Sequence, residues 1–254
     1  MSTMHDVLQL FGGTALLAGQ AFRESFRRPF YMRLVGQQVY LIGVASMPLV
    51  IITAASTGMV MALQFGVGLE KFGGGLYVPK IVSLSIVREM GPVFTCLMLA
   101  ARVGAGIASE LGSMTVTQQI DAIRALGTSP IKRIVIPRVL GCLIAIPSLV
   151  AMAITIGILG GLMVGTQELN LTADFYLEKV FHTVTATDYL AGLGKTPFFA
   201  LFIALSATFF GMNVKSGTQG VGIATTKAVV SSSILILVGD YFLTKLFLVF
   251  EQWL

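Results

Sequence analysis

Five charged side chains lie in or at the edge of long apolar stretches, where charges are rare. A charge at mid-bilayer costs about 2.5–3.5 kcal/mol on insertion scales, so such residues face a protein interior or a water-filled cavity. Arg88 and Glu89 are adjacent and cannot face each other across a helix, so each needs its own partner. We predict Asp240 as the partner of Arg88, and Lys195 or Lys245 as the partner of Glu89.

Two roles are open for these five residues. All of them fall in the outer half of the predicted membrane region, so they could line a substrate pathway. Their pairs could equally do no more than lock neighbouring helices together. The five candidate pathway residues are Arg88, Glu89, Lys195, Asp240 and Lys245.

The remaining polar residues do not form a catalytic or metal-binding pattern. The two histidines, His5 and His182, lie far apart, and both cysteines lie inside apolar runs, where they are expected to be small buried residues. The run from Ala191 to Thr196 looks like the end of a phosphate-binding loop, but Tyr189 stands where that motif needs glycine. We therefore predict no enzyme activity, no metal and no cofactor in this chain, so any ATP dependence must come from a partner.

Composition places the chain in a membrane. Hydrophobic residues make up 55% and charged residues 11% of the sequence, and the mean hydropathy is +0.86, far above a soluble domain. We predict an all-α polytopic membrane protein with a transmembrane domain over residues 37–254 and an amphipathic interfacial segment over 1–36, helical from about Val7 to Phe26. The five predicted spans are about Val39–Phe65, Ile81–Ala108, Val139–Thr166, Thr196–Val214 and Ala228–Phe250.

Loop charges predict the orientation. Cytoplasmic loops carry an excess of Lys and Arg. The basic residues are dispersed along the loops and not clustered with aromatics, so nucleic-acid binding is not expected. We predict a cytoplasmic N-terminus and a periplasmic C-terminus, because one side holds most of the loop cations: Arg23, Arg27, Arg28, Arg33, Arg124, Lys132, Arg133, Arg138, Lys215 and Lys227.

The polar segment from Ser109 to Arg138 connects the second and third spans and carries its own helix signals. Thr115 and Gln118 have capping-box spacing, and Gly127 stands where a C-cap is expected, so we predict a cytoplasmic helix over about 115–127. Apolar residues recur at three-residue spacing on one face, as in a helix that binds a partner protein through that face. This stripe consists of Ile120, Ile123 and Leu126.

Glycines at four-residue spacing allow helices to approach closely. Gly157, Gly161 and Gly165 share one face of the third span, and Gly104, Ala108 and Gly112 do the same at the end of the second. These two faces could pack against other helices of the same subunit, or they could form the contact between two subunits of a dimer.

The chain from about Gln37 to Phe250 resembles the MlaE/YrbE-type permeases, the membrane subunits of ABC systems that move phospholipids across the bacterial envelope. The resemblance rests on Arg88-Glu89-Met90-Gly91-Pro92, Arg102-Val103-Gly104, Glu110-Leu111-Gly112-Ser113-Met114, Gln119-Ile120-Asp121-Ala122, Leu126-Gly127 and Pro137-Arg138. It implies a homodimer in the bacterial inner membrane, with two ABC ATPase subunits, a STAS-domain protein and an MCE-domain hexamer on the outer side.

In that family the loop after the second span is the coupling helix that docks on the ATPase. The candidate coupling residues here are Glu110, Gln119, Ile120, Asp121, Ile123, Arg124 and Leu126. Gln118 stands where these permeases often carry glutamate, which would weaken a charged contact to the ATPase.

The function predicted from these observations is an ABC permease moving glycerophospholipid between the inner membrane and a periplasmic carrier, for outer-membrane lipid asymmetry. Cationic groups near the pathway suit a phosphate headgroup. The alternatives are an ATP-independent channel or proton-coupled carrier using Glu89 and Asp240, and a structural membrane scaffold. The channel or carrier leaves the capped cytoplasmic helix without a purpose, and the scaffold would predict that charges throughout the spans can be removed without effect.

Overall fold

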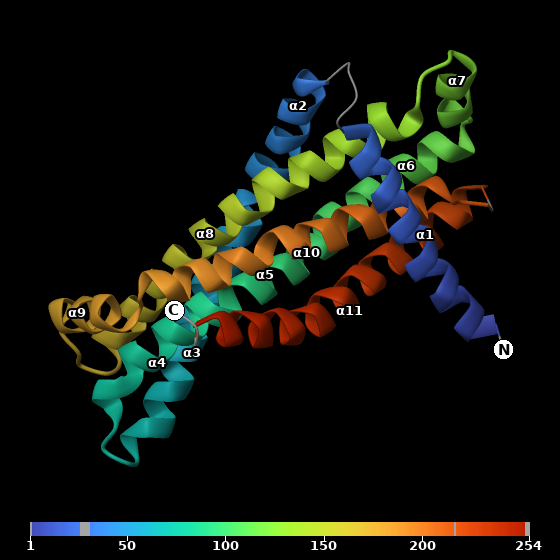
Figure 1. The fold of residues 1–254 in the computed structure, drawn as a ribbon. Coiled ribbons are helices and arrows are strands. Elements are labelled where there is room, and N and C mark those ends of the chain that lie inside the picture. Colours follow the sequence, from blue (N-terminus) through green and yellow to red (C-terminus); the bar gives the residue numbers. More distant parts are fainter. Residues whose placement is uncertain (1, 26–30, 216, 252–254) are drawn as a thin grey trace. The chain divides into compact units, whose positions relative to one another are not determined.

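The computed structural model describes residues 2–25, 31–215 and 217–251, and within these ranges the chain is helical and has no strand (Figure 1). The α-helices are α1 (Ser2–Ser25), α2 (Met32–Gly43), α3 (Met47–Glu70), α4 (Val78–Ser85), α5 (Gly91–Leu99), α6 (Ala105–Val116), α7 (Gln119–Ala125), α8 (Ile136–Gln167), α9 (Ala173–Thr183), α10 (Ala186–Met212) and α11 (Gly217–Glu251). Short 3₁₀ turns, η1 (Val44–Ser46) and η2 (Gly75–Tyr77), precede α3 and α4.

Five helical segments are long and apolar enough to cross a membrane, which confirms the five predicted spans and the all-α polytopic fold. Each begins earlier than predicted, because helical structure continues into the polar residues that precede the apolar run, and the fourth ends at Met212, two residues before the predicted end. The segments are Met32–Glu70, Gly75–Val116, Ile131–Gln167, Ala186–Met212 and Gly217–Phe250.

Three π-helical turns interrupt these segments, and each contains a basic residue. They are η3 (Ile86–Met90), η4 (Ala100–Gly104) and η5 (Ile131–Val135), which hold Arg88, Arg102, and Lys132 with Arg133. A π-turn inserts one residue into the helical register and is frequent at functional sites. The apolar periodicity of the sequence gives no sign of these insertions.

The described residues form two compact units. The first is drawn from 1–44, 99–145 and 199–236, and the second from 45–98, 146–198 and 237–254. Both units combine segments that are distant in sequence, so residues from different spans can meet within one unit.

Glycines allow close helix contacts in the second unit. A Cβ added at Gly58 would overlap the carbonyl oxygen of Gly157, so α3 and α8 touch backbone to backbone there. Gly161 and Gly165 lie against the ring of Tyr176, the largest fully buried side chain of α9. Packing within one chain therefore accounts for the predicted glycine face of the third span.

The glycine face at the end of the second span is also covered within the chain, in the first unit. A Cβ at Gly112 would lie 3.2 Å from side-chain atoms of both Val214 and Val221, and one at Gly104 would lie 3.6 Å from Ile203. These contacts leave neither predicted glycine face open as a dimer seam.

The predicted N-terminal helix is present as α1, although it begins at Ser2, five residues earlier than expected. Ser129 Oγ donates a 2.6 Å hydrogen bond to the Glu24 carboxylate and so ties α1 to the loop after α7. Leu16 and Phe22 are exposed, as an interfacial helix requires. Phe26, Arg27 and Arg28 of this prediction lie outside the described residues.

Candidate functional site

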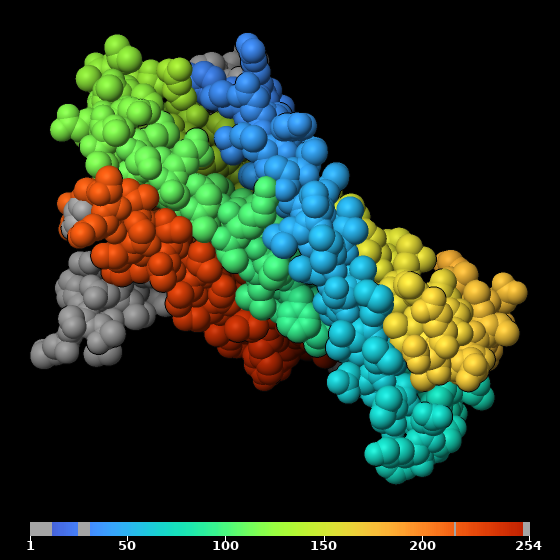
Figure 2. All heavy atoms as spheres, turned by 180° about the vertical axis from the view of Figure 1, so that it is seen from behind, coloured from blue at the N-terminus to red at the C-terminus, as the bar shows by residue number. Residues whose placement is uncertain are grey.

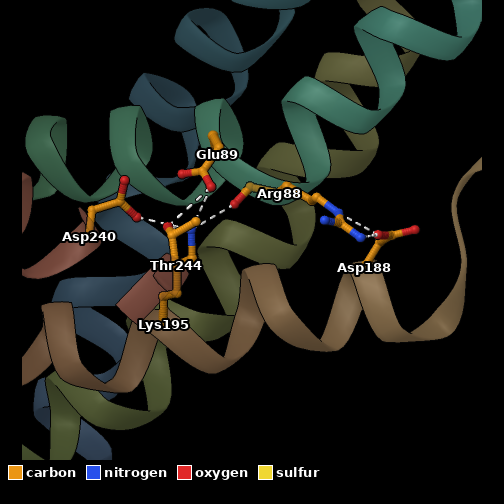
Figure 3. Close-up of polar contacts among 6 residues, drawn as sticks. All are labelled: Arg88, Glu89, Asp188, Lys195, Asp240 and Thr244. Carbon is orange, nitrogen blue, oxygen red and sulfur yellow. Dashed lines mark hydrogen bonds and ion pairs between the residues drawn. The ribbon is translucent and has the colours of Figure 1, made fainter. Parts of the chain in front are cut away.

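Lys195 is the centre of a polar cluster inside the second unit. Its Nζ donates to Glu89 Oε1 at 2.9 Å and to Asp240 Oδ1 at 3.0 Å (Figure 3). It also donates to Thr244 Oγ1 at 2.6 Å and lies 3.1 Å from the Arg88 carbonyl oxygen. The Thr244 hydroxyl in turn donates to Glu89 Oε1 at 3.2 Å. This Lys195 cluster brings together residues from η3, α10 and α11.

Lys195 has no donor left for a ligand. An ammonium group carries three N–H bonds, and four acceptors already surround this one. Its side chain is only 3% exposed. In this structure the charge of Lys195 therefore neutralises Glu89 and Asp240, and its place in a substrate pathway stays a prediction.

Arg88 pairs with a residue that the sequence reading did not select. Its guanidinium binds the carboxylate of Asp188 and points away from Asp240 (Figure 3). The predicted Arg88–Asp240 pair is therefore wrong, whereas Lys195, one of the two partners predicted for Glu89, is confirmed. The reason lies in the positions of these residues on their helices. Asp188 and Lys195 lie two turns apart on α10, and this spacing brings Asp188 to Arg88 and Lys195 to Glu89 in η3.

A local signal could have identified Asp188. Thr185-Ala186-Thr187-Asp188 is a capping box: the Asp188 carboxylate accepts from the Thr185 N–H at 2.8 Å, and the Asp188 N–H donates to Thr185 Oγ1 at 3.3 Å. This box starts α10 at Ala186, ten residues before the predicted start of the fourth span. Asp188 therefore belongs to a membrane-spanning helix and not to the loop before it.

The π-turn η3 and a glycine of α10 make this arrangement possible. Because η3 is wider than an α-helical turn, the backbone carbonyl of Arg88 is available to the Lys195 ammonium. A Cβ at Gly192 would overlap the Val87 carbonyl oxygen, so α10 approaches η3 as closely as backbones allow. A small cavity of about 20 Å³ borders η3 and is lined by Thr53, Thr57 and Thr95 among others, which is room for one water molecule.

Several charges of the site are partly exposed. The side chains of Arg88 and Glu89 are 30% and 31% exposed, and that of Asp240 is 18% exposed. When ionised, two cations face three carboxylates (Glu89, Asp188 and Asp240). Partly exposed charges in a membrane-spanning segment require water or another protein chain beside them, because lipid tails cannot solvate them.

Lys245 does not join this cluster. It follows Thr244 directly on α11, and its side chain is exposed. Successive helical residues point about 100° apart, so Thr244 and Lys245 cannot both face Lys195.

The polar helix between the second and third spans is shorter than predicted. It is α7 (Gln119–Ala125), and α6 extends to Val116 before it. The predicted Thr115–Gln118 capping box is wrong, because Thr115 Oγ1 donates to the carbonyls of Leu111 and Gly211 while Gln118 takes a left-handed conformation (φ 58°).

The end of α7 is as predicted. Gly127 has φ 74°, its N–H donates to Arg124 O, and the Thr128 N–H donates to Ile123 O. These two bonds form a Schellman motif, which needs a left-handed residue at the glycine position.

The predicted apolar stripe is divided between the protein interior and the surface. Ile120 is 4% exposed and is part of the core, whereas Leu126 is 79% exposed and Ile123 is half-buried. Ile120 therefore anchors α7 to its own chain, and of the three stripe residues Ile123 and Leu126 are the two that could contact a partner.

The other candidate coupling residues are polar and accessible. Gln119, Asp121 and Arg124 are exposed, and the last two form an ion pair of 3.1 Å within α7. Glu110 of α6 binds Arg138 Nη2 at 2.7 Å, with its own side chain 57% exposed and that of Arg138 only 7% exposed. Among the residues that the structure describes, no group of three His, Cys, Asp or Glu side chains could hold a metal ion.

Comparison with known proteins shows similarity to permeases over most of the length of the chain. The family model described as "Permease MlaE" matches residues 35–246. A "Probable ABC transporter permease protein" of Rickettsia felis is 41% identical over 94% of this chain and 92% of its own. The "Intermembrane phospholipid transport system permease protein MlaE" of Haemophilus influenzae is 32% identical over 93% of this chain and 88% of its own. The chloroplastic "Protein TRIGALACTOSYLDIACYLGLYCEROL 1" of Arabidopsis thaliana is 28% identical over 91% of this chain and 66% of its own.

Proposed function

Because the chain belongs to the MlaE permease family, we propose that this ABC permease subunit moves glycerophospholipid between the inner membrane and a periplasmic carrier, for outer-membrane lipid asymmetry. The name of the Haemophilus influenzae relative supports phospholipid as the substrate class. The names of the relatives do not favour the ATP-independent channel or proton-coupled carrier as an alternative.

The observation that carries this proposal is the charged site at η3. Arg88 lies in a membrane-spanning segment, its side chain is 30% exposed, and its guanidinium, held by Asp188, is a cation of the kind that binds phosphate. Lys195 stays buried and keeps Glu89 and Asp240 in place beside it. In this mechanism Arg88 contacts the headgroup, and the Lys195 cluster maintains the wall of the pathway.

The conformational change driven by ATP binding and hydrolysis would be transmitted to the permease through α7. Leu126 and Ile123 present a small apolar surface that suits a helix-in-groove contact with an ABC ATPase. Ile120, buried behind them, would transmit movement of α7 to the core of the first unit. ATP and Mg²⁺ would be bound entirely by the ATPase.

The proposed assembly is a homodimer with two ATPase subunits, a STAS-domain protein and an MCE-domain hexamer. The partly exposed Arg88, Glu89 and Asp240 support a second copy or a water-filled cavity on that face, because lipid cannot solvate them. The excess of loop cations supports a cytoplasmic N-terminus, a cytoplasmic α7 and a periplasmic C-terminus.

Reconstitution of the permease with its ATPase tests the function. Purified complex in vesicles of phosphatidylethanolamine and phosphatidylglycerol should transfer a fluorescent phospholipid to acceptor protein only with hydrolysable ATP. The double variant Arg88→Gln/Asp188→Asn removes both charges and keeps hydrogen-bonding groups, and it should reduce transfer at least tenfold. Lys245→Gln, which changes an exposed cation outside the cluster, should transfer at the wild-type rate.

Three outcomes would contradict the proposal. Equal transfer by the double variant would remove Arg88 from the pathway. Absence of a stoichiometric ATPase after gentle detergent extraction, or transfer without ATP, would favour the channel or carrier instead.

A further inference from the structure

A second polar site lies in the first unit, in a groove between four helical elements. The groove encloses about 940 Å³ and is open to the surface. Figure 2 shows this face, with α2 in blue and α6 and α7 in green. Its walls come from Leu34, Tyr40 and Leu41 of α2, Met114 of α6, and Leu126 after α7.

The polar part of the groove is built around Arg138. Its side chain is buried, with only 6% of the residue exposed. Nη2 binds Glu110 at 2.7 Å and Nη1 donates to Ile134 O at 3.0 Å, while Nε is buried without a hydrogen-bond acceptor in the described structure. Arg133, which is exposed, lines the same groove.

The charges in the groove favour an anion. Arg133 and Arg138 contribute two positive charges, and Glu110 is the acidic residue that lines the groove with them. The amides of Gln37 and Gln38 add neutral donors at the α2 wall. One negatively charged group would balance the excess positive charge.

The position of the groove favours a lipid. It is bordered by the first residues of two membrane-spanning segments, Met32–Glu70 and Ile131–Gln167, so it lies where such segments enter the membrane. Basic pockets between transmembrane helices at this depth bind anionic headgroups. Tyr40 and Leu41 are 63% and 56% exposed and continue the groove into an apolar surface suited to acyl chains.

We propose that this groove binds one anionic glycerophospholipid, with its phosphate at Arg133 and Arg138 and its acyl chains along Leu34, Tyr40 and Leu41. The site shares no residue with the Lys195 cluster, so it is additional to the proposed transport pathway. A lipid bound here contacts both α2 and Leu126, and it therefore links the first span to the coupling region.

Retention of native lipid by the purified full-length chain tests this proposal. The chain is incorporated into nanodiscs of equal phosphatidylglycerol and phosphatidylethanolamine, extracted with mild detergent, and analysed by native mass spectrometry. Wild type should retain phosphatidylglycerol preferentially. Arg133→Gln should weaken this retention about fivefold, the effect of removing one cation near anionic lipid. Arg23→Gln is the control, because it removes an exposed cation of α1 outside the groove.

A second variant blocks the groove without changing charge. Gly36 lines it, and a Cβ at this position meets no atom within 4 Å, so Gly36→Phe places a ring in open space. This variant should lose the retained phosphatidylglycerol, whereas Gly68→Phe, at an equally open position on α3, should keep it.

Retention of phosphatidylglycerol by both groove variants at the wild-type level would overturn the inference. If both variants in addition lose an ATPase that co-purifies with the wild-type chain, the groove is a protein-docking surface instead. Neither lipid retention nor co-purification of the ATPase depends on lipid transfer. A negative result for this groove can therefore be told apart from a negative result for the proposed transport function, on which this inference does not rest.

Discussion

Replacing Lys195 by methionine is expected to lower the free energy of unfolding by about 3–5 kcal/mol, the usual cost of removing one partner from a buried ion pair. Methionine nearly keeps the length and volume of the side chain but removes its charge and its three donors. Glu89 and Asp240, now 2.9 and 3.0 Å from Nζ, would lose their shared cation. Thr244 would lose its donor as well.

The structure sets the limits of this effect. At 3 Å and an effective dielectric constant of about 20, each charge pair is worth about 5–6 kcal/mol of Coulomb energy before desolvation is subtracted. Lys195 is 3% exposed, so water cannot replace it directly. Glu89 and Asp240 are 31% and 18% exposed and can be rehydrated in part, which keeps the expected loss near the range for a single broken pair.

A triple variant separates charge balance from packing. Lys195→Met/Glu89→Gln/Asp240→Asn removes the two carboxylates together with the ammonium, and neutral replacement of a whole buried ion cluster is often close to neutral in stability. We expect it to recover most of the lost free energy. If the cluster also forms the wall of the lipid pathway, the triple variant should fold but transfer lipid at least tenfold more slowly.

The assay is reversible unfolding in mixed detergent and SDS micelles, paired with ATP-dependent lipid transfer on the same preparations. Lys245→Met is the matched control, because it makes the same substitution at an exposed lysine of α11 and should change stability by less than about 0.5 kcal/mol. A Lys195→Met variant as stable as this control would refute the electrostatic reasoning. A triple variant with wild-type transfer would show that the cluster only holds helices together.

Three further outcomes are expected. Gly58→Leu should lower the free energy of unfolding by several kcal/mol in the same assay, because α3 and α8 are in backbone contact at Gly58. Gly68→Leu is the control, because a side chain at Gly68 meets open space, and it should be neutral or slightly stabilising. Equal effects of the two substitutions would contradict the close contact. Leu126→Asp should reduce co-purification of the ATPase about tenfold without changing stability, because Leu126 is exposed. Ile120→Asp should unfold the chain, because Ile120 is buried. The opposite result would mean that Ile120 contacts the ATPase and Leu126 stabilises the fold. Burial raises the pKa of Tyr176 to about 12 from a usual value near 10, so stability should fall by about 2–3 kcal/mol as the pH rises from 10 to 12. Tyr176→Phe should lack this fall and be at least as stable below pH 10, because the buried hydroxyl has no hydrogen-bond partner among the residues that the structure describes.

The membrane-spanning helices could be predicted because their cause is local. A backbone in lipid must satisfy its own hydrogen bonds, so every long apolar run becomes a helix whatever its neighbours are. The five spans follow from this rule, and the left-handed Gly127 at the end of α7 follows from an equally local requirement. The Glu89–Lys195 pair could also be anticipated, since few cations lie in the apolar stretches.

Other features depend on contacts between distant residues. Thr115 donates to Gly211 across 96 positions and so extends α6, which the capping-box spacing did not reveal. Ile120 and Leu126 are alike in type and lie on one helical stripe, yet one is buried and the other exposed, because only the fold determines where the core ends.

By itself, the sequence determined that this protein is a bundle of membrane helices with a polar helical segment between the second and third spans, and that charges inside the spans would need partners. Only the tertiary structure decided which partners these are. Arg88 binds Asp188 because the wide turn of η3 and the absence of a side chain at Gly192 bring α10 within reach. Charge alone would have allowed Asp240 equally, since Coulomb attraction selects the sign of a partner, whereas backbone geometry selects the residue.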